Sequence, residues 1–161
     1  MTVRPIHPSD VAAVVGLVRE LADYERALHE VHLTEQQLTD CLFGDSPALF
    51  GHVADHEGEV VGVALWFLNF STWRGTHGIY LEDLYVQPGH RGRGFGKELL
   101  RTLAAVCVER GYSRLEWSVL DWNTPSIEFY KAAGAVPMDE WTVFRLTDDA
   151  LTDFATDRRN P

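Results

Sequence analysis

The sharpest local signal in the sequence is the glycine-rich stretch Gly89-His90-Arg91-Gly92-Arg93-Gly94-Phe95-Gly96-Lys97. It lies between a predicted strand at about 78–86 and the strongest predicted helix, at about 94–110. Glycine lets the backbone turn tightly and approach a ligand closely, and the first N–H groups of the following helix form an anion site. Three basic side chains add positive charge. The stretch predicts a diphosphate site, although a plain glycine-rich connection with solvated basic residues has the same composition.

Two other phosphate-binding patterns do not match this stretch. A Walker loop needs the spacing G-x-x-x-x-G-K-[ST], which the stretch lacks. A dinucleotide fingerprint needs G-x-G-x-x-G inside an early βαβ unit, whereas the closely spaced glycines here are at positions 92, 94 and 96. The stretch therefore predicts a different kind of diphosphate site.

The rest of the chain predicts alternating helices and strands around this stretch. Thr34, followed three residues later by Gln37, is typical of a helix start with a capping box. Antiparallel hairpins in the first half and α/β crossovers in the second predict an α/β fold with a mixed sheet and helices on both faces. The predicted strands are at about 2–6, 49–54, 60–70, 78–86, 114–120 and 141–146, and the helices at about 8–27, 34–44, 94–110, 125–133 and a short C-terminal segment.

The composition is that of a globular protein with an acidic surface. The chain has 161 residues, and its 24 acidic residues outnumber the 14 Lys and Arg to give a net charge of −10. That charge argues against nucleic-acid binding, which needs cations to neutralise phosphates, and it suits a cationic small molecule. It equally suits a protein whose charge only keeps it in solution. We expect one domain over residues 1–161.

The cysteines and the apolar runs indicate no metal and no membrane. Cys41 and Cys107 are far apart, and no His/Cys cluster has metal-ligand spacing, so we expect neither a disulfide framework nor a metal site. The first residues lack the apolar core of a signal peptide, and no apolar run reaches membrane-spanning length. We therefore expect a cytoplasmic protein that binds no membrane.

The glycine-rich stretch also carries a resemblance to a known family. Arg91-x-x-Gly94-x-Gly96 after a strand resembles the acetyl-CoA signature of the GCN5-related N-acetyltransferase (GNAT) superfamily. The likeness extends over nearly the whole chain, from Val3 to about Leu146. Residues 20–25, 80–86 and 121–131 resemble the diamine (spermidine/spermine) acetyltransferase subgroup.

Within that subgroup, residues 70–75 and 119–123 are more similar to the thialysine acetyltransferase branch. Polyamine enzymes of the subgroup carry an additional acidic residue where Ser71 stands in this chain. Because that residue would help to hold a long polycation, its replacement favours a shorter, lysine-like or diamine substrate.

The resemblance implies a GNAT-like fold with six to seven strands in a mixed, mostly antiparallel sheet, a homodimer, and acetyl-CoA or CoA as cofactor. The main chain of Leu84 and Val86 would pair with the pantetheine arm and supply an N–H to the thioester oxygen. Asn123 also fits a plain helix cap, and Lys131 fits a solvated side chain. The implied cofactor contacts are Leu84, Tyr85, Val86, Arg91, Gly92, Arg93, Gly94, Phe95, Gly96, Lys97, Asn123, Ser126, Tyr130 and Lys131.

Acetyl transfer to an amine needs a proton acceptor and a proton donor. An alkyl ammonium with a pKa of about 10.4 must lose its proton first, which costs about 4–5 kcal/mol at neutral pH. Glu82 and Asp83 are adjacent in a predicted strand, so their side chains are expected on opposite faces. We favour Glu82 as the acceptor, with Asp83 as the lesser candidate. Tyr130 is the candidate general acid, by resemblance, although Phe129-Tyr130 also fits a pair of core aromatics.

The candidates for holding the cationic substrate are Tyr24, Glu25, Trp73, Glu82 and Asp83. A carboxylate beside an aromatic face holds an ammonium by charge and by cation–π attraction. Glu25 also fits a solvated residue at a helix end. Two other functions stay open, namely a protein or peptide N-acetyltransferase and a non-catalytic acyl-CoA sensor with the same fold.

Overall fold

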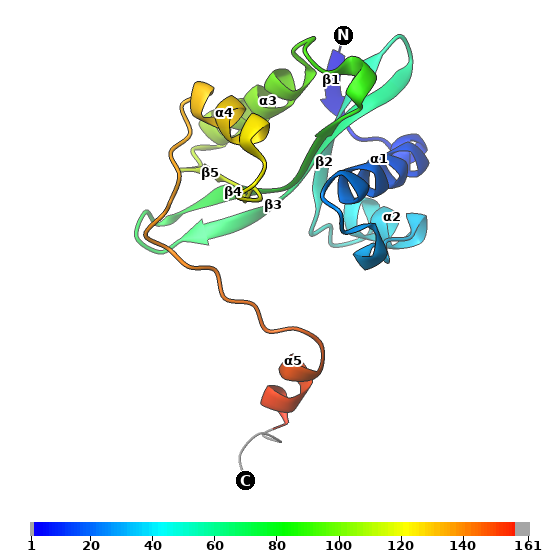
Figure 1. Cartoon of the computed structure of the whole chain (residues 1–161). Coiled ribbons are helices and arrows are strands. Elements are labelled where there is room, and N and C mark those ends of the chain that lie inside the picture. The colour runs from blue at the N-terminus through cyan, green and yellow to red at the C-terminus, as the bar shows by residue number, and fades with distance from the viewer. Residues whose placement is uncertain (1, 157–161) are drawn as a thin grey trace. The chain divides into compact units, whose positions relative to one another are not determined.

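The computed structural model describes residues 2–156. Contacts within the chain group it into two compact units, the first ending at Asn123 and the second beginning at Thr124. The single domain expected over residues 1–161 stays a prediction. Figure 1 shows the elements of both units.

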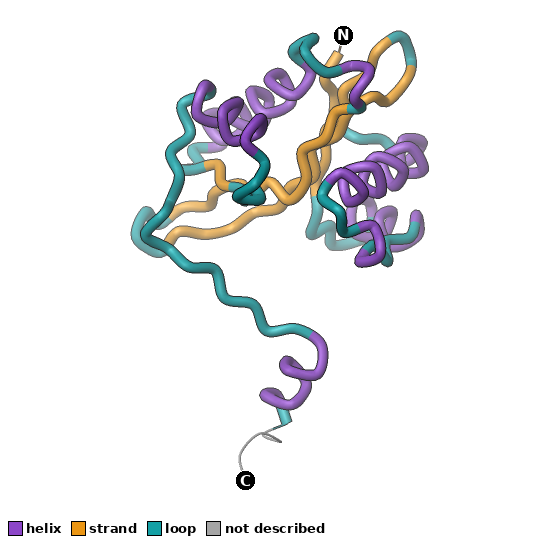
Figure 2. Tube along the Cα trace, viewed as in Figure 1, coloured by secondary structure: helices purple, strands orange, loops and turns teal. Residues whose placement is uncertain are grey.

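The first unit is built on one sheet with the strand order β1-β2-β3-β4-β5 (Figure 2). The first three neighbouring pairs are antiparallel and β4 pairs with β5 in parallel, so the predicted mixed, mostly antiparallel sheet is confirmed. The strands are β1 (Thr2–Pro5), β2 (Phe50–His56), β3 (Glu59–Ser71), β4 (Thr76–Val86) and β5 (Leu115–Glu116).

The number of strands corrects the prediction of six to seven. The described residues form five strands. The strand predicted at 114–120 is reduced to Leu115–Glu116, and residues 141–146 form no strand. A strand exists only where a neighbour takes its hydrogen bonds, so alternating apolar residues are not sufficient to make one.

The helices agree closely with the sequence pattern. Thr34 accepts a hydrogen bond from Gln37 N at 3.2 Å and its own N–H donates to Gln37 Oε1 at 2.9 Å, which confirms the capping box. The helix predicted at 8–27 splits into η1 and a shorter α1. The helices of the first unit are η1 (Pro8–Asp10), α1 (Val11–Tyr24), η2 (Leu28–Glu30), α2 (Glu35–Phe43), η3 (Pro88–His90) and α3 (Phe95–Arg110), and those of the second are α4 (Thr124–Ala132) and α5 (Asp148–Ala155).

Helices cover both faces of the sheet in the first unit. α1 and α2 lie on one face and α3 on the other (Figure 1). Side chains of α1 and α2 such as Val14 and Leu38 are buried with Val53 and Val63 of the sheet in one apolar core. At 25 cal/mol per Å² of apolar surface, this burial is the main contribution to folding. The core fixes β4 between two layers of helix, and β4 carries most of the candidate site.

A β-bulge interrupts β4 at Glu82. Asp83 is opposite Leu65 and Leu81 is opposite Trp66, so Glu82 is the additional residue on its strand. A bulge bends the strand and resets the alternation of its side chains. The strand therefore changes direction at the two carboxylates that the sequence singles out.

Candidate active site

The glycine-rich stretch forms the turn from β4 into α3. Arg91 N–H donates to Pro88 O at 3.3 Å, and the next backbone hydrogen bond along the chain is that from Glu98 N–H to Gly94 O at 3.0 Å. Gly94, the residue before the helix, has φ of 87°, a left-handed conformation that glycine adopts without strain. The N–H groups of residues 92–97 thus have no backbone acceptor within the described residues, which is the arrangement that binds an anion.

The Arg91 side chain folds back towards the end of β4. Its Nε donates to Val86 O at 2.9 Å. Its guanidinium lies 5.2 Å from the ring centroid of Tyr24 and 5.4 Å from that of Tyr85. Arg91 therefore connects the turn to β4 and α1, and it holds its positive charge beside the turn.

The C-terminal half of β4 has one open edge. Gln87 N–H donates to Val61 O, so counting back along the strand places Tyr85 on the β3 side and Leu84 and Val86 on the opposite side. On that opposite side β5 pairs with β4 only at Ile79 and Tyr80. Within the described residues, the main-chain N–H groups of Leu84 and Val86 therefore face an edge without a strand. An extended amide-bearing arm can pair there.

Two aromatic residues among the predicted cofactor contacts, Tyr85 and Phe95, are buried, as is Asn123. Phe95 is 2% exposed and Tyr85 is 6% exposed, so both side chains belong to the core. The Phe95 ring packs edge-on against His56 and His90. These residues can contribute to a cofactor site through the main chain. Arg93 and Lys97 are exposed at the turn.

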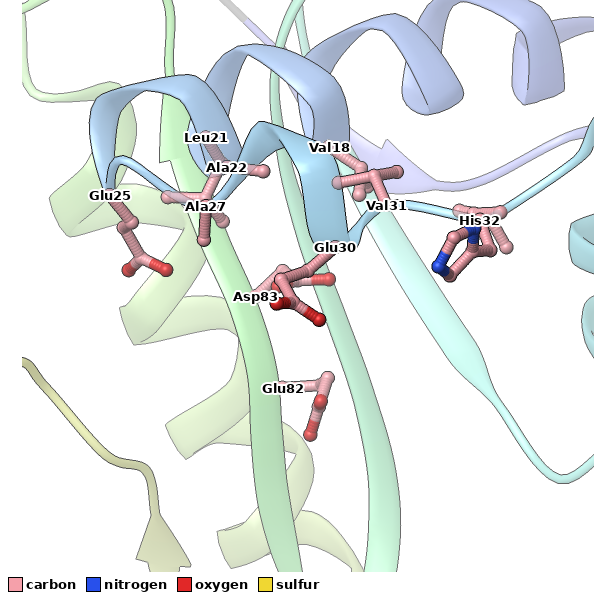
Figure 3. Close-up of a pocket in the computed structure, with 11 residues that line it drawn as sticks. Val18, Leu21, Ala22, Glu25, Ala27, Glu30, Val31, His32, Glu82 and Asp83 are labelled. Atoms are coloured by element: carbon pink, nitrogen blue, oxygen red, sulfur yellow. The ribbon is translucent and has the colours of Figure 1, made fainter. Parts of the chain in front are cut away.

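A cavity of about 310 Å³ lies between β4, α1 and the loop after α1 (Figure 3). Its polar wall combines carboxylates from three elements, and its apolar wall comes from the inner side of α1 and the loop. The lining residues are Val18, Leu21, Ala22, Glu25, Ala27, Glu30, Val31, His32, Leu33, Glu82 and Asp83.

Glu82 and Asp83 both line this cavity, whereas regular alternation along the strand predicts their side chains on opposite faces. The prediction assumed regular alternation, and the bulge at Glu82 removes it. Burial, together with the smaller effects of the nearby negative charges of Glu82 and Glu25, raises the pKa of Asp83 to about 6. Burial also raises the pKa of Glu25. The pKa of Asp83 therefore lies close to neutral pH.

The two aromatic candidates for the substrate end lie outside the cavity lining. Trp73 is 89% exposed in the turn between β3 and β4, and it forms no aromatic wall beside the carboxylates of this chain. Tyr24 OH donates to Asn123 Oδ1 at 3.2 Å, and its ring lies 5.9 Å from that of Trp122. Tyr24 and Asn123 therefore support one another beside Arg91.

Glu30 and His32 are lining residues that the sequence reasoning missed. Both belong to the loop between α1 and α2, where a carboxylate or an imidazole has no distinguishing pattern. The sequence gives one indication of their position. Polar and apolar residues follow Glu25 directly, and a segment that follows a helix end can fold back against the last turn of that helix.

The remaining predicted residues belong to the second unit. Ser126, Tyr130 and Lys131 are on α4, where Lys131 Nζ lies 3.7 Å from Glu128 Oε1. The rings of Phe129 and Tyr130 are 5.3 Å apart. Their roles in cofactor binding and catalysis stay predictions.

Residues 2–156 contain neither a metal-binding cluster nor a membrane-spanning helix. No group of three or more His, Cys, Asp or Glu side chains among these residues could hold a metal ion. No helix among them is long and apolar enough to cross a membrane.

Comparison with known proteins places this geometry in a family. The model of the acetyltransferase (GNAT) family matches residues 15–135. Thialysine N-epsilon-acetyltransferase of Bos taurus is 36% identical over 95% of this chain and 96% of its own. L-ornithine N5-acetyltransferase of Arabidopsis thaliana is 30% identical over 92% of this chain and 85% of its own.

Solved structures have the same fold. An integron cassette protein from the mobile metagenome of V. cholerae superposes with a TM-score of 0.80, at 25% identity and over 96% of both chains. Ribosomal-protein-alanine N-acetyltransferase of Brucella melitensis gives a TM-score of 0.71 at 22% identity over 92% of this chain and all of its own, which bears on the fold alone. The resemblance inferred from the sequence is confirmed, and the chain belongs to the acetyltransferase (GNAT) family.

Proposed function

We propose that this N-acetyltransferase transfers the acetyl group of acetyl-CoA to a small, cationic primary amine, a diamine, a polyamine or a thialysine- or lysine-like amino acid, within a ternary complex. The observation that carries the proposal is the cavity in which the carboxylates of Glu25 directly after α1, Glu30 in η2, and Glu82 and Asp83 in β4 come together. Such a wall attracts a cation. The curated relatives named for thialysine and L-ornithine support a small amine, and they do not favour a protein acceptor or a non-catalytic sensor.

The turn into α3 and the open edge of β4 fit acetyl-CoA. The free N–H groups of residues 92–97 suit its diphosphate, with Arg91, Arg93 and Lys97 adding charge. The main chain of Leu84 and Val86 suits the amides of the pantetheine arm. The cofactor supplies the acetyl thioester. Members of this family generally use it.

In the first step of the proposed reaction, the protein removes a proton from the substrate ammonium. Asp83 suits this task, because it lines the cavity and burial raises its pKa to about 6, close to neutral pH. Glu82 and Glu25 keep the surroundings negative and so hold the ammonium before the proton leaves. We therefore propose Asp83 as the acceptor, directly or through water.

The second step is attack of the neutral amine on the thioester carbon. The new N–C bond forms, the C–S bond breaks, the attacking nitrogen releases its surplus proton to water, and negative charge develops first on the carbonyl oxygen and then on sulfur. The Leu84 N–H is the proposed donor to the oxygen, and Tyr130 is the proposed donor of a proton to the leaving sulfur.

The deciding experiment is a CoA-release assay with acetyl-CoA and five acceptors: putrescine, spermidine, lysine, thialysine and an N-terminal peptide. We expect release with the small amines and little with the peptide. Preference for the peptide would reject the substrate class. Calorimetry with CoA alone tests the cofactor independently, and the absence of both heat and thermal stabilisation would reject the proposal as a whole.

A further inference from the structure

Glu30 and His32 line the cavity from the segment that follows α1. Both residues are exposed, whereas Glu25 and Asp83 on the same cavity are partly buried. Figure 3 shows Glu30 and His32 on the loop that follows α1, with Asp83 approaching from β4. An amine that reacts beside Asp83 therefore has its other end near this loop.

We infer that Glu30 and His32 recognise the distal end of the acceptor, Glu30 by binding a second ammonium and His32 by binding a carboxylate next to it. This inference rests on the proposed function and adds to it the residues that determine which amines are preferred. The substrate class that satisfies both residues is an α-amino acid with an amine at the end of its side chain.

Charge complementarity supports the two assignments. His32 is the sole basic side chain among the residues that line the cavity, and the other titratable lining groups are the carboxylates of Glu25, Glu30, Glu82 and Asp83. A substrate carboxylate would be repelled everywhere along this wall except at the imidazole. An imidazole carries at least one N–H donor in either protonation state, so it can bind a carboxylate in both.

The Glu30 carboxylate is available to a ligand on its exposed side. Its Oε1 lies 3.2 Å from His29 Nε2, and both side chains are more than 70% exposed, at 73% and 77%. A contact so open to water is weak and screened by salt, and a substrate ammonium can replace it or share the carboxylate. For the same reason the effect of Glu30 on affinity is modest, about two- to fivefold.

Three acceptors with the same five-carbon chain separate the two interactions. Pentylamine has one ammonium group and cadaverine has two. Lysine has two ammonium groups and also a carboxylate. With the wild-type enzyme we expect KM to fall by about two- to fivefold from pentylamine to cadaverine, and to stay level or fall again for lysine. The cadaverine advantage shrinks in 0.5 M salt, because exposed charges are screened.

Substitutions show which residue causes each difference in KM between these acceptors. Glu30→Gln should raise KM about two- to fivefold for cadaverine and lysine and leave pentylamine unchanged. His32→Leu should raise KM for lysine only, and lysine methyl ester, whose carboxylate is blocked, should be insensitive to it. Glu35→Gln on α2, an exposed carboxylate outside the cavity lining, is the matched control and should change none of the three.

Equal effects of Glu30→Gln on pentylamine and cadaverine would overturn the role of Glu30. An unchanged lysine KM in His32→Leu would overturn the role of His32. Either result can occur while wild-type enzyme acetylates all three amines, in which case the proposed function stands. If none of the amines releases CoA, the proposed function itself fails.

Discussion

At the scale of single residues, Asp83 combines the position and the proton affinity that an acceptor needs. It lines the cavity, and burial with neighbouring negative charge raises its pKa to about 6. We expect Asp83→Asn to lower kcat by about 100-fold. The wild-type kcat/KM should rise with pH through about 6 as Asp83 ionises, and the variant should lose this limb. Glu82→Gln, on the same cavity, should keep the limb, and its loss there would transfer the role to Glu82.

The raised pKa of Asp83 also makes a prediction about stability. A carboxyl whose pKa rises from 3.8 to about 6 on folding favours the folded state only while it is protonated, so the wild type loses stability as pH rises from 4 to 6. Asp83→Asn should therefore be more stable than wild type above pH 6, by about 2–3 kcal/mol, and equal to it below pH 4. Urea unfolding at pH 4 and pH 8 measures this. Glu59→Gln, at an exposed carboxylate, should show no such difference between the two pH values.

Tyr130 is the residue whose assignment depends most on resemblance. If its hydroxyl protonates the leaving sulfur, Tyr130→Phe should lower kcat by at least tenfold and change the KM for acetyl-CoA little, because binding does not need that proton. Steady-state kinetics with varied acetyl-CoA separates the two constants. Tyr112→Phe, another partly buried tyrosine, is the control. An unaltered kcat in Tyr130→Phe would remove the assignment.

Sequence reasoning reached the site residues that a local pattern marks, and it missed those that the tertiary fold supplies. Glu25, Glu82 and Asp83 were expected, and all three line one cavity. Glu30 and His32 were not expected, because a loop residue acquires its neighbours only when the loop folds over its helix. The regular alternation assumed for Glu82 and Asp83 is interrupted by the bulge at Glu82, which the local sequence pattern does not mark.

At the scale of elements, the turn from β4 into α3 depends on the left-handed backbone of Gly94. We expect Gly94→Ala to raise the KM for acetyl-CoA at least tenfold, because an alanine resists φ of 87° and would redirect the free N–H groups. Gly58→Ala in the β2–β3 turn is a closely matched control, since Gly58 has φ of 89° and both glycines have open space around them. Both variants should lose about 1 kcal/mol of stability, and only the first should lose affinity. If Gly94→Ala and Gly58→Ala had equal KM values for acetyl-CoA, the turn would not bind the cofactor.

A comparison of the predicted and observed ends of the helices and strands shows which of them local sequence is sufficient to determine. Helix α2 begins at Thr34 as predicted, because a capping box is a contact between residues three apart. Strands β2, β3 and β4 were predicted within a few residues, since each carries its own apolar pattern. Residues 141–146 have an equally good pattern and form no strand, because pairing depends on a partner elsewhere.

At the scale of the whole molecule, the negative net charge of the protein and the charges at its candidate site have one explanation. A net charge of −10 surrounds a cavity walled by four carboxylates, whereas the basic residues of the turn at 91–97 form a local exception. Substrate and cofactor carry opposite charges, so a protein that binds both needs regions of both signs. Acceptor KM should accordingly rise with salt.

Residues 136–144 expose more apolar side chains than an isolated chain in water favours. Trp141, Val143 and Phe144 are 68%, 81% and 92% exposed, and so many exposed apolar side chains in one segment favour burial against a partner. We expect a homodimer in which a second copy covers this segment, seen by light scattering as twice the 18.2 kDa mass. Val143→Lys should shift the protein towards the monomer. Val108→Lys, at a helix position that is 82% exposed, should leave the dimer intact. A wild-type monomer at 100 µM would contradict the prediction.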